Sequence, residues 1–220
     1  NDTRWVLSLA GRSYHIGTFD GHEFKAQTEP IQMNYGPDAY ASQSWSDVPN
    51  SRRVMIDWMM SWKYARRLDL IPTRPWNGSM SFPKELTLRE TEDGVRLYQL
   101  PVKEISNLRK KYHCHEDIDI EPGKPFSPQL NGTCIELQAE FEIKSAISFG
   151  LEVMRSNRTK YVFNHRSHDI AGEKTTIEYN VEQEKLIVDR STSGTVYSED
   201  FPQSFSAPLK LMGKIIKLKL

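Results

Sequence analysis

The sequence predicts an all-β fold, and two kinds of observation lead to it. Apolar and polar residues alternate along many runs, which is typical of strands with one buried face. The longest run is residues 135–143, where Ile, Leu, Ala, Phe and Ile alternate with Glu and Gln. Asp-Gly pairs, which favour tight hairpin turns, stand between strand-like runs at Asp20-Gly21 and Asp93-Gly94. Short strands punctuated about every ten residues predict a sandwich, a barrel or a propeller.

The same alternation predicts strands elsewhere along the chain. The further runs are residues 14–19, 23–24, 54–60, 86–89, 95–99, 149–153, 177–181 and 216–220. In the run 54–60, successive side chains point to opposite faces of the strand. Ile56 and Trp58 therefore share one face, and Asp57 points to the other.

Residues 101–112 follow a different pattern, which predicts a short helix. Apolar residues recur there at helical spacing: Val102, Ile105, Leu108 and Tyr112. Pro101 precedes them, and the basic residues 109–111 suit a helix C-terminus. We interpret this helix as a linker between an N-terminal all-β part, residues 1–100, and a C-terminal β-sandwich, residues 113–220. The last alternating run ends with the sequence, so we expect the sandwich to be truncated there.

Composition excludes several classes of partner. The formal net charge is +0, from 29 basic and 29 acidic residues, which predicts no binding to nucleic acid or to an anionic membrane. No apolar run approaches the roughly 20 residues of a membrane-spanning helix.

Cysteine usage indicates no metal site, and we expect no cofactor. Cys114 and Cys134 lack the partner spacing of a metal site, and a disulfide between them stays open. Asn-x-Ser/Thr sequons occur at Asn1, Asn77, Asn131 and Asn157. Such sequons favour, weakly, an extracellular setting.

The first half of the chain holds many aromatic residues close to carboxylates. The aromatic residues are Trp45, Trp58, Trp62, Tyr64 and Trp76, and the carboxylates are Asp38, Asp47 and Asp57. Aromatic rings stack on sugar C–H surfaces while carboxylates accept hydroxyl hydrogen bonds, so the mixture suits a carbohydrate cleft. Large aromatic residues also fill cores, and composition alone favours that role.

A collinear series of motifs changes this balance. The motifs are WVLS at 5–8, GTFDG at 17–21, MNYGPDAYASQSW at 33–45, RRVMIDWMMSW at 52–62, WNGSMSFPKEL at 76–86, LYQLP at 97–101 and VDRSTSG at 188–194. The series resembles glycoside hydrolase family 32, the invertases, inulinases and levanases, and is looser from Lys111 onward. Two residues depart from the family pattern: Lys84 stands where arginine is usual, and Asp57 where glycine or asparagine is common.

The resemblance implies a five-bladed β-propeller that carries the active site, followed by a β-sandwich. Such enzymes retain the anomeric configuration, using an Asp nucleophile and a Glu acid/base about 5–5.5 Å apart. We therefore expect the last blade or two of the propeller and the sandwich, from a secreted enzyme that cleaves fructosyl bonds in sucrose, inulin or levan.

The catalytic motifs that the resemblance implies are absent from this sequence. These motifs are Asn-Asp-Pro-Asn for the nucleophile, Arg-Asp-Pro for a supporting Asp, and Glu-Cys for the acid/base. Asp2 is followed by Thr3-Arg4, and Glu136 follows Cys134 in the wrong order. We expect the catalytic carboxylates upstream of residue 1, an inactive chain, and no pocket shared by Asp2 and Glu136.

Two residues resemble parts of the family's fructosyl pocket. Asp38 resembles a carboxylate that lines the pocket, and Trp62 an aromatic wall, whereas Trp58 suits the core. We expect Asp38 to begin a strand antiparallel to the run ending before Trp62, which would bring the two residues together. An ordinary turn role for Asp38 and a core role for Trp62 remain alternatives.

Other functions remain open at this stage. The chain could be a non-catalytic carbohydrate-binding or interaction module, or part of a related propeller glycosidase for another furanoside such as arabinan. A terminal blade without its neighbour exposes apolar faces, so we also expect self-association through the propeller edge.

Overall fold

The computed structural model describes residues 3–65, 75–76, 78–128, 130–156, 159–163, 166–170, 172–194, 196 and 198–220, the stretch 159–170 by its backbone alone. The fold is all-β, with 44% of the residues in strands and 7% in helices. The chain divides into two compact units. The first comprises Asn1–Val102 and Ile147–Lys210, and the second Lys103–Ala146 and Leu211–Leu220.

The first sheet of the larger unit is built around strand β2. Its strands are β1 (Trp5–Leu9), β2 (Ser13–Phe19), β3 (Phe24–Ala26) and β4 (Ile31–Gln32). All pairings are antiparallel, and β2 pairs with each of the other three. The predicted turn at Asp20-Gly21 joins β2 to β3. The backbone N–H groups of Glu23 and His22 donate to the Asp20 carboxylate and hold its pKa below the ordinary value.

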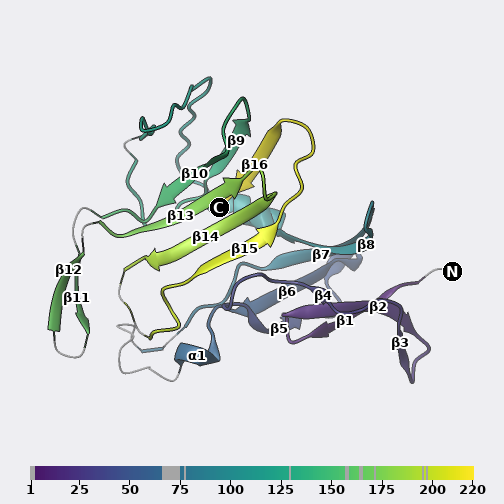
Figure 1. The fold of residues 1–220 in the computed structure, drawn as a ribbon. Helices are drawn as coiled ribbons and strands as arrows, with labels where there is room; N and C mark the ends of the chain where they lie inside the picture. The colour runs from purple at the N-terminus through teal and green to yellow at the C-terminus, as the bar shows by residue number, and fades with distance from the viewer. Residues whose placement is uncertain are drawn as a thin grey trace. The chain divides into compact units, whose positions relative to one another are not determined.

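The second sheet of this unit is an antiparallel meander. Its strands are β5 (Tyr40–Ser44), β6 (Arg53–Trp58), β7 (Lys84–Thr91) and β8 (Gly94–Pro101), and they pair in chain order (Figure 1). A 3-10 turn, η1 (Pro49–Ser51), lies between β5 and β6. The predicted hairpin at Asp93-Gly94 is confirmed, because Thr91 pairs with Gly94. Four antiparallel strands in chain order are the arrangement of a propeller blade.

A small apolar core lies between these two sheets. Its buried residues are Tyr14, Ile16, Met33 and Met55, and Val6, Ile31, Leu86, Leu88, Val95 and Leu97 pack against them. The Tyr14 hydroxyl also accepts a hydrogen bond of 3.0 Å from the Leu97 backbone N–H. This core fixes β2 against the hairpin of β7 and β8.

The third sheet of the larger unit comes from the second half of the chain. Its strands, in spatial order, are β10 (Ser148–Val153), β13 (Lys174–Asn180), β14 (Lys185–Thr192) and β15 (Ser204–Pro208). The predicted alternation holds: Ile177 and Tyr179 are buried, and Phe149 and Leu151 are partly buried. A two-stranded hairpin, β11 (Thr159–Phe163) and β12 (Arg166–Ile170), lies between β10 and β13 in the chain.

The smaller unit contains a 3-10 helix and one strand pair. The helix η2 (Lys103–Leu108) is shorter than the predicted 101–112 and not α-helical. Leu108 and Tyr112 are 72% and 85% exposed, so no burial of their side chains supports a longer helix. Strands β9 (Gln138–Glu142) and β16 (Ile215–Lys219) pair antiparallel, with β9 beginning three residues later than the run at 135 predicts.

Several remaining expectations concern single residues or boundaries. Cys114 and Cys134 are both free thiols at the surface, so no disulfide joins them. Asp2, Asn1, Asn77 and Asn157 lie outside the described residues. The domain boundaries at 100 and 113 stay a prediction.

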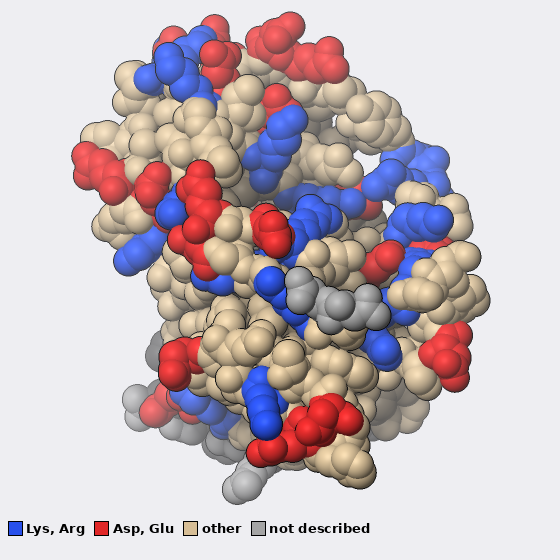
Figure 2. Space-filling model, turned by 90° about the vertical axis from the view of Figure 1, so that its right-hand side faces the viewer, with Lys and Arg blue, Asp and Glu red and all other residues tan. Residues whose placement is uncertain are grey.

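The charged surface agrees with the balanced composition. Figure 2 shows basic and acidic side chains interspersed over the face it displays. In the part of the chain that the structure describes, no helix has the length and apolar character needed to cross a membrane.

Candidate functional site

The Asp38 carboxylate is held by an arginine of strand β14, which lies 152 residues later in the chain. Asp38 lies two residues before β5, so the expectation that it begins the strand is wrong by two residues. Its Oδ2 atom forms an ion pair with Arg190 Nη1, and the two side chains are only 21% and 15% exposed. The other oxygen, Oδ1, is buried and has no donor among the described residues.

Arg190 itself is fixed on every side. Its Nε atom donates to the Phe201 carbonyl over 2.8 Å, and its Nη2 atom donates to the Tyr64 hydroxyl over 3.2 Å. The guanidinium carbon lies 4.3 Å from the ring centre of Phe201, 5.2 Å from that of Phe205 and 5.6 Å from that of Tyr64. Such cation–π contacts favour a desolvated guanidinium. These contacts fix the guanidinium of Arg190, so that its Nη1 group donates to Asp38 in a fixed direction.

Trp62 lies at the surface near the end of β6. It begins the short helix α1 (Trp62–Ala65), which sequence periodicity did not predict, and it is 58% exposed. Its ring centre is 5.0 Å from that of Trp58, which packs against a cluster of Met60, Tyr64 and Ala65. An exposed indole supported by a second indole is a suitable platform for a sugar face.

The strand arrangement behind the pocket prediction is present. Strands β5 and β6 are antiparallel, and Tyr40 pairs with Trp58, so the start of β5 lies beside the end of β6. The Tyr40 and Trp58 rings are 6.5 Å apart. The substrate-binding roles of Asp38 and Trp62 stay a prediction.

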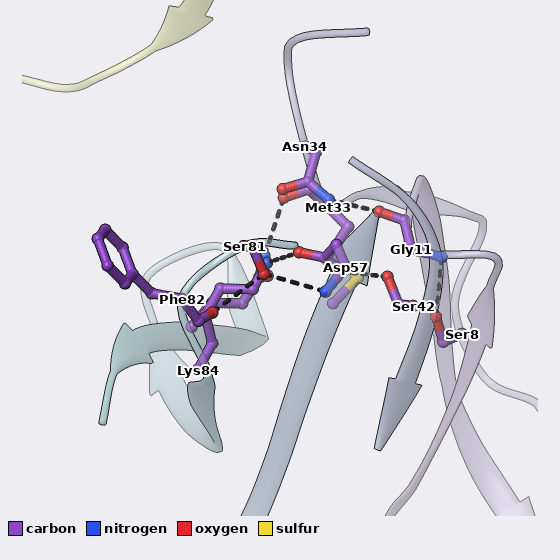
Figure 3. A network of polar contacts seen from close by, with 10 residues as sticks. Ser8, Gly11, Met33, Asn34, Ser42, Asp57, Ser81, Phe82 and Lys84 are labelled. Carbon is purple, nitrogen blue, oxygen red and sulfur yellow. Dashed lines mark hydrogen bonds and ion pairs between the residues drawn. The ribbon is translucent and has the colours of Figure 1, made fainter. Parts of the chain in front are cut away.

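A buried polar network underlies this edge of the sheet (Figure 3). Asp57 is fully buried, forms an ion pair with Lys84 and accepts a hydrogen bond from the Ser42 hydroxyl. The Asp57 backbone N–H donates to the Ser81 hydroxyl over 3.0 Å. Lys84 also donates to the Gln99 side-chain carbonyl over 2.9 Å. Both ions thus have several partners, as buried charges require.

The network extends to the segment that leads to Asp38. The Gln99 side-chain amide donates to the Met33 carbonyl over 2.9 Å, and the Asn34 amide donates to the Gly11 carbonyl. Gly11 has a φ of +80°, and a Cβ atom there would lie 1.8 Å from the Ser42 hydroxyl oxygen. Glycine is therefore required at this turn. Sequence reasoning missed the network, although its signal was visible: Asp57 and Lys84, the two departures from the family pattern, carry opposite charges.

Glu136 has the wrong electrostatics for a catalytic acid. In the smaller unit its two carboxylate oxygens accept hydrogen bonds from Arg109 over 3.2 and 2.6 Å. These bonds, with Gln138 and Lys219, lower the pKa of Glu136 from 4.5 to about 2. A general acid needs a raised pKa, so Glu136 is an ion-pair residue rather than an acid/base.

The sheet topology defines the class of protein: a propeller-type blade sheet with sandwich-type sheets. Residues 6–101 match the N-terminal domain of glycosyl hydrolases family 32, and residues 104–220 match the C-terminal domain of that family. The chain belongs to glycoside hydrolase family 32, which confirms the resemblance.

Relatives match the chain over nearly its whole length. A levanase from Bacillus subtilis is 32% identical over 100% of this chain, which spans 33% of the levanase. An extracellular exo-inulinase from Aspergillus awamori is 24% identical over 95% of the chain, which spans 40% of the inulinase. The chain thus spans about a third to two fifths of these relatives.

Solved structures show the same fold. The exo-inulinase from Aspergillus awamori superposes with a TM-score of 0.60 at 20% identity, over 94% of this chain and 40% of that one. A β-fructofuranosidase from Schwanniomyces occidentalis, complexed with fructosyl-erythritol, gives a TM-score of 0.54 at 17% identity, over 94% and 41%. The predicted fold class, part of a propeller followed by a sandwich with a short helix between them, is confirmed.

Proposed function

We propose that this chain is part of a retaining glycosidase that cleaves fructosyl bonds in sucrose, inulin or levan. The observation that carries the proposal is family membership over both halves of the chain, with relatives named levanase and exo-inulinase. The chain contributes a pocket wall and not the catalytic pair, because no Asn-Asp-Pro, Arg-Asp-Pro or Glu-Cys motif occurs in it. Alone it is inactive, since nucleophile and acid/base supply most of the rate.

Asp38 and Trp62 are the substrate-binding residues in this proposal. Support comes from the partly buried carboxylate of Asp38, which Arg190 holds and whose Oδ1 atom has no donor among the described residues, and from the exposed indole of Trp62. Carboxylates accept sugar hydroxyls and indoles cover apolar sugar faces. The proposed substrate is a fructoside, in line with relatives named levanase and exo-inulinase, and no cofactor or metal enters the proposal.

The organisation and setting of the protein complete the proposal. Residues 1–100 form the end of the propeller, 101–112 the linker and 113–220 the sandwich. The protein acts outside the cell, which agrees with the Aspergillus relatives being named extracellular exo-inulinases.

An exposed apolar face on β1 supports self-association. Trp5, Leu7 and Leu9 alternate along this strand and are 46%, 44% and 42% exposed. Among the described strands, β1 pairs with β2 alone. An apolar face on such a strand favours contact with a second copy.

A chimera tests the catalytic proposal. The part of the Bacillus subtilis levanase that precedes its match is fused to this chain, and reducing-sugar release from levan is measured for the chimera and for the chain alone. We expect activity from the chimera only. Asp38→Ala and Trp62→Ala should each lower kcat/KM by about tenfold to a hundredfold, the worth of a charged hydrogen bond or a stacking contact.

The control is Tyr98→Ala, which removes a surface aromatic residue of β8. It should leave kcat/KM unchanged. Hydrolysis by the chain alone would contradict the proposal, because it would show that this chain contains catalytic residues. If the chimera keeps its activity with Asp38→Ala and with Trp62→Ala, neither residue binds the substrate.

A further inference from the structure

We propose that Arg190 is a positioning residue for Asp38: from 152 residues away in the chain, its guanidinium sets the direction of the Asp38 carboxylate. Contacts within the larger unit fix the position of the carboxylate. That Asp38 then offers its second oxygen to a fructoside hydroxyl rests on the proposed function.

The guanidinium has one orientation because each of its nitrogen atoms has a different partner. The Nε and Nη2 atoms are bound to the Phe201 carbonyl and the Tyr64 hydroxyl, which leaves Nη1 for Asp38. The rings of Tyr64, Phe201 and Phe205 lie around the guanidinium. A planar fork with fixed donors can impose direction on a carboxylate, whereas a lysine ammonium supplies only a point charge.

Asp38, in contrast, depends on this partner. Among the described residues, Arg190 is the donor to its carboxylate, and the Oδ1 atom has none. An ionised carboxylate that is mostly buried is costly without a counter-charge, so loss of Arg190 should turn Asp38 toward water. With Arg190 present, Oδ2 is occupied, and Oδ1 is the oxygen that has no donor among the described residues.

The surroundings hold the Arg190 guanidinium in place independently of Asp38. The three rings and the Phe201 carbonyl would hold the guanidinium without Asp38. The Nη1 group nevertheless meets a carboxylate that precedes β5, in a segment anchored through Met33 and Asn34. The geometry therefore fits a role directed at Asp38 in addition to packing.

The test uses the full chain with ¹⁵N-labelled arginine and ¹³C-labelled aspartate. In the unaltered chain we expect slow rotation of the Arg190 guanidinium and a single Asp38 side-chain carboxyl signal. Arg190→Lys should shift that carboxyl signal, whereas Asp38→Asn should leave guanidinium rotation slow, because the three rings and the Phe201 carbonyl still hold Arg190. The matched control is Arg52→Lys, since Arg52 pairs with Glu85 at 3.0 Å with side chains 19% and 32% exposed. It should leave the Asp38 signal in place.

A double-mutant cycle gives the size of the coupling. Arg190→Lys and Asp38→Asn should be non-additive by about tenfold to a hundredfold in the unfolding equilibrium constant, as for a charged hydrogen bond. An unmoved Asp38 signal in Arg190→Lys, or an additive cycle, would overturn the proposal and leave Arg190 a packing residue. Both variants keep a polar side chain of similar size, so we expect both proteins to fold and the cycle to be measurable.

The levanase chimera separates this proposal from the proposed function. If Arg190→Lys is as active as the parent chimera while Asp38→Ala is impaired, positioning fails and the pocket assignment stands. If Asp38→Ala is fully active while the Asp38 signal still follows Arg190→Lys, the pocket assignment fails and positioning stands.

Discussion

Replacing Lys84 by Met is expected to destabilise the chain strongly, because it leaves a buried charge without its partner. Asp57 is 0% exposed, and the side chain of Lys84 is 16% exposed. Methionine has nearly the length of lysine and fills the same space, so the substitution removes charge rather than volume. It also removes the donor to Gln99, whose side-chain carbonyl accepts from Lys84 over 2.9 Å.

The magnitude follows from this asymmetry. Breaking a buried ion pair by removing one partner costs about 3–5 kcal/mol, because the remaining charge stays desolvated. Asp57→Asn should cost less, about 1–3 kcal/mol. The Lys84 ammonium that remains still donates a hydrogen bond to Gln99, and its side chain is partly exposed to water. In the double variant neither site carries a charge. Its cost should therefore fall well below the sum of the two single variants.

The assay is urea unfolding followed by tryptophan fluorescence and circular dichroism, for both single variants and the double variant. Lys210→Met is the matched control, because Lys210 and Asp93 form a pair at 3.6 Å with side chains 64% and 62% exposed. Surface pairs contribute about 0–1 kcal/mol, so the control should unfold near the parent midpoint. Equal midpoints for Lys84→Met and Lys210→Met, or strict additivity in the cycle, would refute the reasoning.

Three further outcomes can be measured on the same chain. Because the pKa of Glu136 is lowered from 4.5 to about 2, its ion pair should stabilise the chain above pH 4.5, and this stabilisation should be lost progressively as the pH falls from 4.5 to 2. Arg109→Gln should move the pKa of the Glu136 carboxyl group, followed by NMR, back toward 4.5. On the proposed self-association through β1, the parent chain should sediment as an oligomer and Leu7→Lys as a monomer, because the lysine charges the apolar face of β1. Tyr179→Phe should cost about 1–3 kcal/mol in urea unfolding, since it leaves the Leu209 carbonyl without the hydroxyl now 2.9 Å away.

Local pattern was sufficient for most strands. Alternation and Asp-Gly turns predict β2, β7, β8 and β10 to within a few residues, because burial of one face and turn chemistry are both local properties. The helix α1 was missed since it has only four residues, too few for helical periodicity. Its buried residues, Tyr64 and Ala65, are fixed by tertiary packing instead.

The candidate site could be predicted only in part. Asp38 and Trp62 were proposed through the resemblance and their roles stay a prediction, whereas the pairing of Tyr40 with Trp58 follows from antiparallel order. Arg190 lies in the VDRSTSG motif of the resemblance, but its contact with Asp38 could not be predicted. The two residues are 152 positions apart, and no local periodicity links a guanidinium in β14 to a carboxylate before β5.

The polar network shows why departures from a family pattern are better considered in pairs. Taken singly, Asp57 adds a charge on a strand where the resemblance expects none, and Lys84 weakens the expected arginine to a point charge. In the structure each accounts for the other, because the Lys84 ammonium lies against the Asp57 carboxylate and both are shielded from water. A lysine without an anion, or an aspartate without a cation, would leave a lone charge in that position. Removing both charges is therefore expected to cost less than the two single removals added together, and the double-mutant cycle of Lys84→Met and Asp57→Asn measures that dependence directly.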